Sequence, residues 1–82
     1  MARVRSIQPM SLNARRHPTE VDCGYQVFES EGGRMLQLST FGSDQRKSDP
    51  KVSQTLQLDR QGAAALVKLL NDTFPGISDE YA

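Results

Sequence analysis

The side chains that could form a catalytic pair lie close together in the first third of the chain. His17 is the only histidine, Cys23 is the only cysteine, and Asp22 precedes the cysteine. A thiol beside an imidazole and a carboxylate can act as a nucleophile. The alternation of apolar residues, however, places the thiol on the same face of a strand as Val21 and Tyr25, and the proline after His17 favours a turn. We therefore interpret Cys23 as a small core residue and predict that the protein is not an enzyme.

The sequence contains no cluster of residues that would bind a metal or a nucleotide cofactor. One histidine and one cysteine cannot supply the three or four ligands of a zinc site. The pair Gly32-Gly33 fits a tight hairpin turn, and the sequence contains no glycine-rich phosphate-binding fingerprint. We expect neither a metal nor a cofactor.

Alternation of apolar and polar residues predicts three strands. Residues 21–28 and 35–41 flank a turn at 31–33, and residues 53–58 form the third strand. One face of the second and third strands is apolar and carries Leu36, Leu38, Leu56 and Leu58.

A helix is predicted over residues 60–73. Asp59 can cap it by accepting hydrogen bonds from the first-turn amides, and Pro75-Gly76 ends it. Apolar residues at spacings of three and four form one stripe, which comprises Ala63, Leu66, Val67, Leu70 and Phe74. We expect this stripe to cover the leucine-bearing face, because a small meander cannot bury its own apolar face.

Length and composition indicate one small α+β domain. The prediction is an antiparallel meander sheet of three to four strands followed by one C-terminal helix packed on one face. Residues 1–18 form an N-terminal arm that either adds an edge strand or stays mobile, 19–76 form the β-β-β-α domain, and 77–82 form a tail. Only 37% of the 82 residues are hydrophobic, so the core is thin and help from a partner subunit is expected.

Net charge and the number of cysteines limit the partners and the cellular compartment that fit this protein. Ten basic and ten acidic side chains give no net charge, so composition alone does not indicate a nucleic-acid partner. A single cysteine allows no intrachain disulfide, which fits a reducing compartment. No apolar run approaches the roughly 20 residues of a membrane span. We expect a cytoplasmic protein without a membrane partner.

The other face of the predicted sheet is polar but uncharged in its middle. Such a face suits a second copy of the same sheet, or nucleic-acid bases, which stack on aromatic rings. An ordinary solvated polar face is the alternative. The residues predicted on it are Gln26, Phe28, Gln37, Ser39, Phe41, Ser53, Thr55 and Gln57.

A long polar loop, residues 42–52, joins the second and third predicted strands. Hairpin loops are usually about 2–5 residues long, and longer ones are often functional. Arg46, Lys47 and Lys51 could grip phosphates there, and a merely solvated loop is the alternative.

Several short segments then suggest a family. They are Met35-Leu36-Gln37-Leu38 in the second strand, Phe41 after it, Pro50-Lys51 at the end of the loop, and Leu56-Gln57-Leu58 before the helix. Over Tyr25 to Leu70, their order resembles the positive cofactor four family of transcriptional coactivators and its bacterial relatives. That family is a homodimer whose curved sheets bind single-stranded DNA, and the resemblance implies the same here.

The chain departs from this family at two places. Ser39-Thr40 precedes Phe41 where the family has an arginine before an aromatic pair, and Ser53-Gln54-Thr55 replaces a Lys-Lys-Gly segment. Both changes remove charges that would contact phosphate. Segments around His17 to Val21 and on both sides of the long loop also resemble short actinobacterial and phage proteins.

The resulting prediction is a homodimer that binds single-stranded DNA or RNA in transcription or DNA maintenance. The alternative is a protein–protein interaction module of a bacterial or phage regulatory system, which docks on a larger protein without direct nucleic-acid binding. In the first reading, phosphates meet Arg34, Arg46, Lys47 and Lys51, and bases meet Phe28, Gln37, Phe41 and Gln57.

Overall fold

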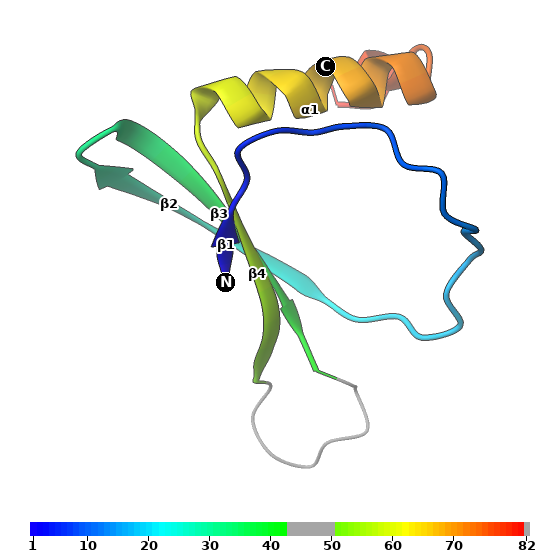
Figure 1. Cartoon of the computed structure of the whole chain (residues 1–82), viewed down its shortest axis with the longest axis horizontal. Helices are drawn as coiled ribbons and strands as arrows, with labels where there is room; N and C mark the ends of the chain where they lie inside the picture. The colour runs from blue at the N-terminus through cyan, green and yellow to red at the C-terminus, as the bar shows by residue number, and fades with distance from the viewer. Residues whose placement is uncertain (43–50, 82) are drawn as a thin grey trace.

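The computed structural model of the chain describes residues 1–42 and 51–81. These residues form four strands, one α-helix and one short 3-10 helix, and the arrangement confirms the predicted α+β class (Figure 1). The elements, in chain order, are β1 (Ala2–Arg3), β2 (Cys23–Ser30), β3 (Gly33–Phe41), β4 (Val52–Leu58), α1 (Arg60–Thr73) and η1 (Ile77–Glu80).

The four strands form one open sheet in the order β1-β4-β3-β2. The pairs β2–β3 and β3–β4 are antiparallel, as the meander predicted. The arm adds its edge strand at its very start, where β1 pairs parallel with β4, and the amide of Val4 continues this pairing by donating to the carbonyl of Gln57 at 2.9 Å. The rest of the arm then runs out past α1 and returns to β2 (Figure 1).

The strand boundaries differ from the prediction by only a few residues. β2 begins at Cys23 rather than at residue 21, and the turn that follows it uses Gly33 at φ 112°, a conformation that favours glycine. The register of β3 against β4 shifts between Thr40 and Phe41, so β4 carries a bulge near its start.

The register assigns each strand residue to one of two faces. We call one the leucine face; it carries Ala2, Cys23, Tyr25, Val27, Glu29, Arg34, Leu36, Leu38, Thr40, Gln54, Leu56 and Leu58. We call the other the glutamine face; it carries Arg3, Gly24, Gln26, Phe28, Ser30, Gly33, Met35, Gln37, Ser39, Phe41, Val52, Thr55 and Gln57. Ser53, which was predicted on this face, lies at the register shift and has no partner in the register.

The helix prediction is confirmed at both ends. The Asp59 carboxylate accepts a hydrogen bond from the amide of Gly62 at 2.8 Å, and this caps the first turn. At the other end Gly76 adopts φ 83°, which turns the chain into η1.

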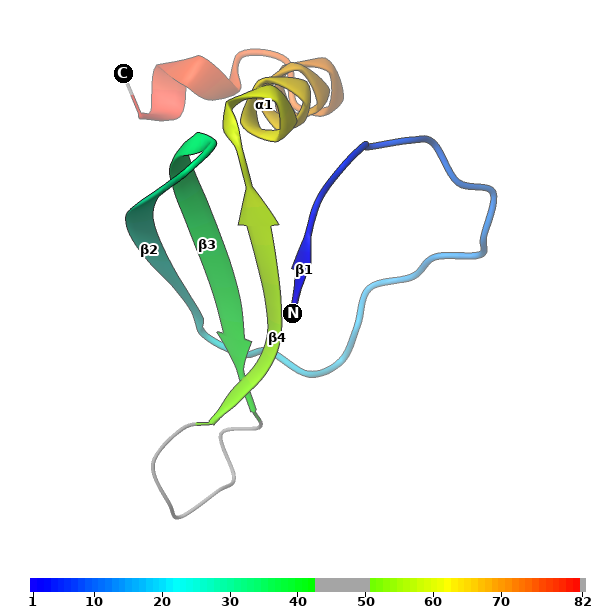
Figure 2. The same ribbon diagram turned by 60° about the vertical axis from the view of Figure 1, so that its left-hand side comes forward.

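The expected cover of the leucine face by α1 is only partial, since Leu36 and Leu38 are half-buried. Leu58 is only 5% exposed where α1 begins, but Leu56, two residues earlier, is 50% exposed, and no residue of α1 is buried. The physical reason is the short connection: Asp59 caps the helix directly after β4, so α1 crosses the end of the sheet instead of lying along it (Figures 1 and 2).

Cys23 is a second correction. Its thiol belongs to the leucine face, as the alternation predicted, but it is exposed rather than part of a core. The reason is the same, since no helix covers this end of the sheet.

Candidate functional site

A row of polar side chains crosses the whole glutamine face. Gln26 pairs with Gln37, Gln37 pairs with Gln57, and Gln57 pairs with Arg3, so the row takes one residue from each of the four strands. Side chains directly opposite each other on neighbouring strands lie about 4.5–5.5 Å apart at Cβ. Three amides and one guanidinium therefore form a continuous line of planar, hydrogen-bonding groups.

Hydrogen bonds hold the middle of this face in place. Gln57 Nε2 donates to Gln37 Oε1 at 2.9 Å, and in the next row the hydroxyls of Ser39 and Thr55 are 3.0 Å apart. Thr55 is only 7% exposed, so this second pair lies at the base of the face. An amide has two N–H groups and two acceptor lone pairs. The Gln57–Gln37 bond uses only part of this capacity, so both side chains can still bond a ligand.

Phe41 borders this polar centre and lies over Gly24. A Cβ atom built at Gly24 would come within 3.3 Å of two ring carbons of Phe41. The absence of a side chain at Gly24 therefore lets the ring lie against the sheet. Phe28, the other predicted aromatic contact, pairs with the buried Met35 at the far end of the same face.

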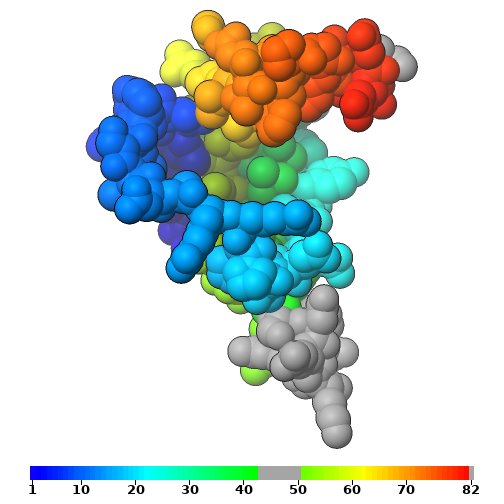
Figure 3. Space-filling view, turned by 90° about the vertical axis from the view of Figure 1, so that its right-hand side faces the viewer, coloured from blue at the N-terminus to red at the C-terminus, as the bar shows by residue number. Residues whose placement is uncertain are grey.

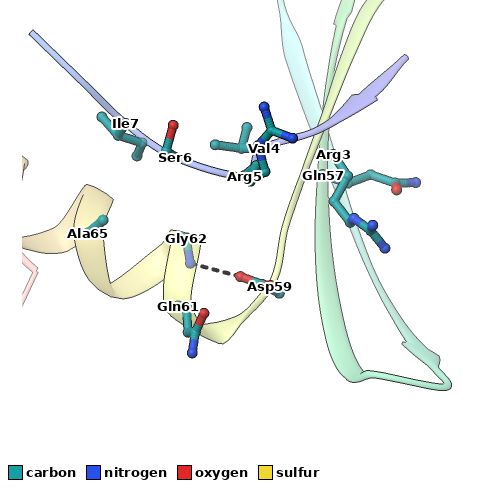
Figure 4. Close-up of a pocket in the computed structure, with 10 residues that line it drawn as sticks. All are labelled: Arg3, Val4, Arg5, Ser6, Ile7, Gln57, Asp59, Gln61, Gly62 and Ala65. Carbon is teal, nitrogen blue, oxygen red and sulfur yellow. Dashed lines mark hydrogen bonds between the residues drawn. The ribbon is translucent and has the colours of Figure 1, made fainter.

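One basic residue lies at the margin of the glutamine face, and another lies at the nearby strand ends. Arg3 stands at its edge, where its side chain lies beside Gln57 and points the same way (Figure 4). Lys51 lies opposite Gly42, one position beyond the pair of Phe41 and Val52, and the amide of Gly42 donates to its carbonyl at 2.9 Å.

A hollow adjoins the edge of the row. It has a volume of about 840 Å³ and lies between the start of the arm and the first turns of α1 (Figure 4). Arg3, Arg5 and Gln57 line it, and so does Asp59, whose carboxylate is engaged by the amide of Gly62. The two guanidinium groups make this edge suitable for an anionic group.

Sequence reasoning and structure agree on part of the predicted site. Phe28, Gln37, Phe41 and Gln57 share one face, as predicted. Arg34 does not join them: it belongs to the leucine face, where its guanidinium bonds Glu29 at 2.9 Å. Arg46 and Lys47 lie outside the described residues.

Arg3 and Gly24 were missed by the sequence reasoning. The alternation of Arg3, Val4 and Arg5 is a strand-like signal, but it is too short to show which strand β1 pairs with. The role of Gly24 can be recognised only in the structure, where the absence of a side chain lets the Phe41 ring lie against the strand.

The residues considered for catalysis make local contacts instead. The Cys23 thiol lies 3.6 Å from the carbonyl of Gly24, and His17 Nδ1 accepts a hydrogen bond from the amide of Thr19 at 3.1 Å. Each side chain is thus engaged with the backbone of its own segment.

No family model, curated protein or solved structure matches this chain. The resemblance to the positive cofactor four family therefore stays a prediction. In the part of the chain that the structure describes, no helix has the length and apolar character needed to cross a membrane.

Proposed function

We propose that this protein binds single-stranded nucleic acid, without catalysing a reaction, through its glutamine face. The observation that carries the proposal is the row of Gln26, Gln37, Gln57 and Arg3, which is in register across all four strands. The proposal includes a role in DNA maintenance or transcription, in the cytoplasm.

The chemistry of the row suits unpaired bases. Base edges carry both donors and acceptors, and an amide side chain can bond either kind of group. The exposed part of the Phe41 ring offers a stacking surface, which contributes about 1–3 kcal/mol per base in single-strand binders. A double helix would hide these base edges, so the face favours a single strand.

Phosphates are assigned to the basic margins. Arg3 borders the face, and the predicted contacts Arg46, Lys47 and Lys51 belong to the same proposal. Cations that neutralise phosphates release counterions, so binding weakens as salt rises.

A titration of a fluorescently labelled single-stranded oligonucleotide at several salt concentrations tests the proposal. Binding should fall steeply with salt, and Arg3→Gln should reduce the slope of log affinity against log salt by about 0.7–1. Absence of binding at low salt, or binding that salt does not affect, contradicts the proposal.

Arg34→Gln is the matched control, because it removes an equal charge from the leucine face. Its Glu29 partner already neutralises Arg34 locally at 2.9 Å. We expect the slope to stay at the wild-type value. Equal losses in the two variants would mean that net charge, and not the glutamine face, drives binding.

A protein-interaction module is the second candidate function. The observation that favours it is the exposed apolar surface of the leucine face and of α1. This surface lies away from the glutamine row, so the two candidates are separable by mutation.

A further inference from the structure

We propose that the hollow between the arm and α1 binds a phosphomonoester group, carried either by the end of a nucleic-acid strand or by a free nucleotide. The inference deepens the proposed function, and it rests on that function where a strand carries the phosphate. The site is the hollow of about 840 Å³ that adjoins Arg3 at the end of the glutamine row.

Two arginines of the arm give the hollow its positive charge. Arg3 and Arg5 line it, and both are exposed. Neither forms an ion pair with another of the described residues. A phosphomonoester carries a charge of about −1.5 to −2 at pH 7, whereas an internal phosphodiester carries a single negative charge. Two guanidinium groups therefore suit a phosphomonoester better, and each can bond two of its oxygens.

Asp59 opposes these charges only in part. Among the described residues that line the hollow it is the only acidic one, and its carboxylate accepts a hydrogen bond from the amide of Gly62 at 2.8 Å (Figure 4). The carboxylate thus lies at the first turn of α1, where the helix dipole offsets part of its charge. The two arginines leave the hollow with a net positive charge.

The arm is anchored on both sides of Arg5. Before it, the amide of Val4 donates to the carbonyl of Gln57 at 2.9 Å, and the side chain of Val4 is half-buried. After it, Ile7 is half-buried as well and lies beside α1 (Figure 4). Arg5 is therefore held at the hollow before a ligand arrives, which lowers the entropy lost on binding.

Gly62 keeps the wall that α1 contributes free of a side chain. A Cβ atom there would lie 3.4 Å from Oδ1 of Asp59 and 3.8 Å from the carbonyl oxygen of Val4. The start of the arm and the first turns of α1 lie side by side at this end of the molecule (Figure 3). Glycine is less favourable than alanine within a helix, but here it leaves space between the two segments.

Neutral polar groups complete the lining. Ser6 supplies a hydroxyl, and Gln57 and Gln61 supply amides, all of which can donate to phosphate oxygens. The volume is within the range of about 300–1,000 Å³ that is usual for ligand pockets.

The position of the hollow connects it to the glutamine row. Arg3 pairs with Gln57 at the end of the row and also lines the hollow. A strand whose bases lie along the row would bring its terminal phosphate to this edge of the sheet.

An NMR titration of the ¹⁵N-labelled full chain with a deoxynucleoside monophosphate tests the hollow without a strand. The backbone amide signals of Ser6 and Gly62, on the two walls, should shift, and that of Gly32, in the turn after β2, should not. The nucleoside without phosphate is the control ligand and should leave all three signals unchanged. Absence of shifts at Ser6 and Gly62 at millimolar monophosphate overturns the inference, and so do equal shifts with the nucleoside.

Fluorescence anisotropy tests the same contact in a strand. Oligonucleotides of one sequence carry a phosphate at the 5′ end, a phosphate at the 3′ end, or hydroxyls at both ends. We expect one of the phosphorylated strands to bind about tenfold more tightly than the unphosphorylated one. If all three bind equally while the monophosphate shifts Ser6 and Gly62, the free nucleotide is the source of the phosphate.

The two experiments separate this inference from the proposed function. Monophosphate binding without any strand binding would overturn the proposed function and keep the phosphate site. Strand binding on which a terminal phosphate has no effect, with no response to the monophosphate, would keep the proposed function and overturn the inference.

Arg5→Gln is the variant that removes the site. It should abolish both the tenfold gain and the monophosphate shifts. Arg60→Gln is the matched control, because it removes the same charge from the first residue of α1, which does not line the hollow, and it should keep the gain. Both side chains are exposed, so neither variant removes a core contact. An unchanged gain in Arg5→Gln, or equal losses in the two variants, overturns the inference.

Discussion

The two faces of the sheet differ in chemistry. Their exposure is the reverse of what a self-sufficient domain would show. The glutamine face is polar, yet it contains the buried residues Thr55 and Met35. The leucine face is apolar, yet Tyr25 and Leu56 on it are exposed. In a stable monomer the apolar face is the covered one. The comparison shows that polarity alone does not tell which residues of this sheet are covered.

The largest expected effect concerns the packing of α1 against the end of the sheet. Leu58 is the leucine-face residue that α1 buries, so Leu58→Ala should lower the free energy of unfolding by about 2–5 kcal/mol. Urea denaturation measures this loss. Leu69→Ala is the control: Leu69 is nearly half exposed, beside the arm, and should cost less than about 1 kcal/mol. Equal costs would show that Leu58 is not the central contact between α1 and the sheet.

The next effect compares two glutamines of the same strand. Gln57 belongs to the glutamine row and Gln54 to the leucine face. Gln57→Leu removes the bond to Gln37 and should weaken oligonucleotide binding about tenfold, or about 1.4 kcal/mol. Gln54→Leu should leave binding unchanged. A fluorescence anisotropy titration distinguishes them, and equal losses would remove the functional distinction between the faces.

A smaller effect comes from the position of Phe41. In Gly24→Ala the new methyl group meets the Phe41 ring at 3.3 Å, so the ring must shift by a few tenths of an ångström. We expect binding to weaken a few-fold, with a stability loss of about 1 kcal/mol or less. Gly32→Ala is the control, because a Cβ there meets nothing within 4 Å. If both variants bind like the wild type, the Phe41 ring is not a stacking surface.

The smallest effect lies on α1, on the side away from its apolar stripe. Lys68 donates to the Asp72 carboxylate at 2.8 Å, and this hydrogen bond with the attraction of the carboxylate raises the pKa of Lys68 above its usual 10.5. A raised pKa means that the stabilisation is present below the pKa of the unfolded chain and is lost as pH rises through the folded pKa. Lys68→Gln should therefore melt slightly below the wild type at neutral pH.

The difference should vanish in strongly alkaline solution, where the wild type loses the same interaction. Asp72→Asn removes the same pair and should behave alike. A difference in melting temperature that grows with rising pH would contradict the assignment.

Much of the fold could be predicted from local patterns. Period-two alternation located β2, β3 and β4 within a few residues, and Asp59 with Pro75-Gly76 located α1. These signals are local, because a strand or a helix cap depends on neighbouring residues. The parallel pairing of β1 with β4 was not predictable, since two residues carry too little pattern to select a partner.

The position of α1 relative to the sheet was the least predictable feature. The stripe indicated that α1 needs an apolar partner surface, but an amphipathic pattern does not say which molecule supplies that surface. The same limit applies to Arg34 and Gln37. Both were assigned to one site, and only the register places them on opposite faces.

The most direct test of the proposed function is an NMR titration of the ¹⁵N-labelled protein with an unlabelled single-stranded oligonucleotide. The side-chain amide groups of Gln37 and Gln57 give separate signals from those of Gln54, so one experiment reports on both faces. We predict large shift changes for Gln37 and Gln57, together with the backbone of Phe41, and little change for Gln54. Changes confined to the leucine face, or no change at saturating oligonucleotide, would contradict the assignment of nucleic-acid binding to the glutamine face.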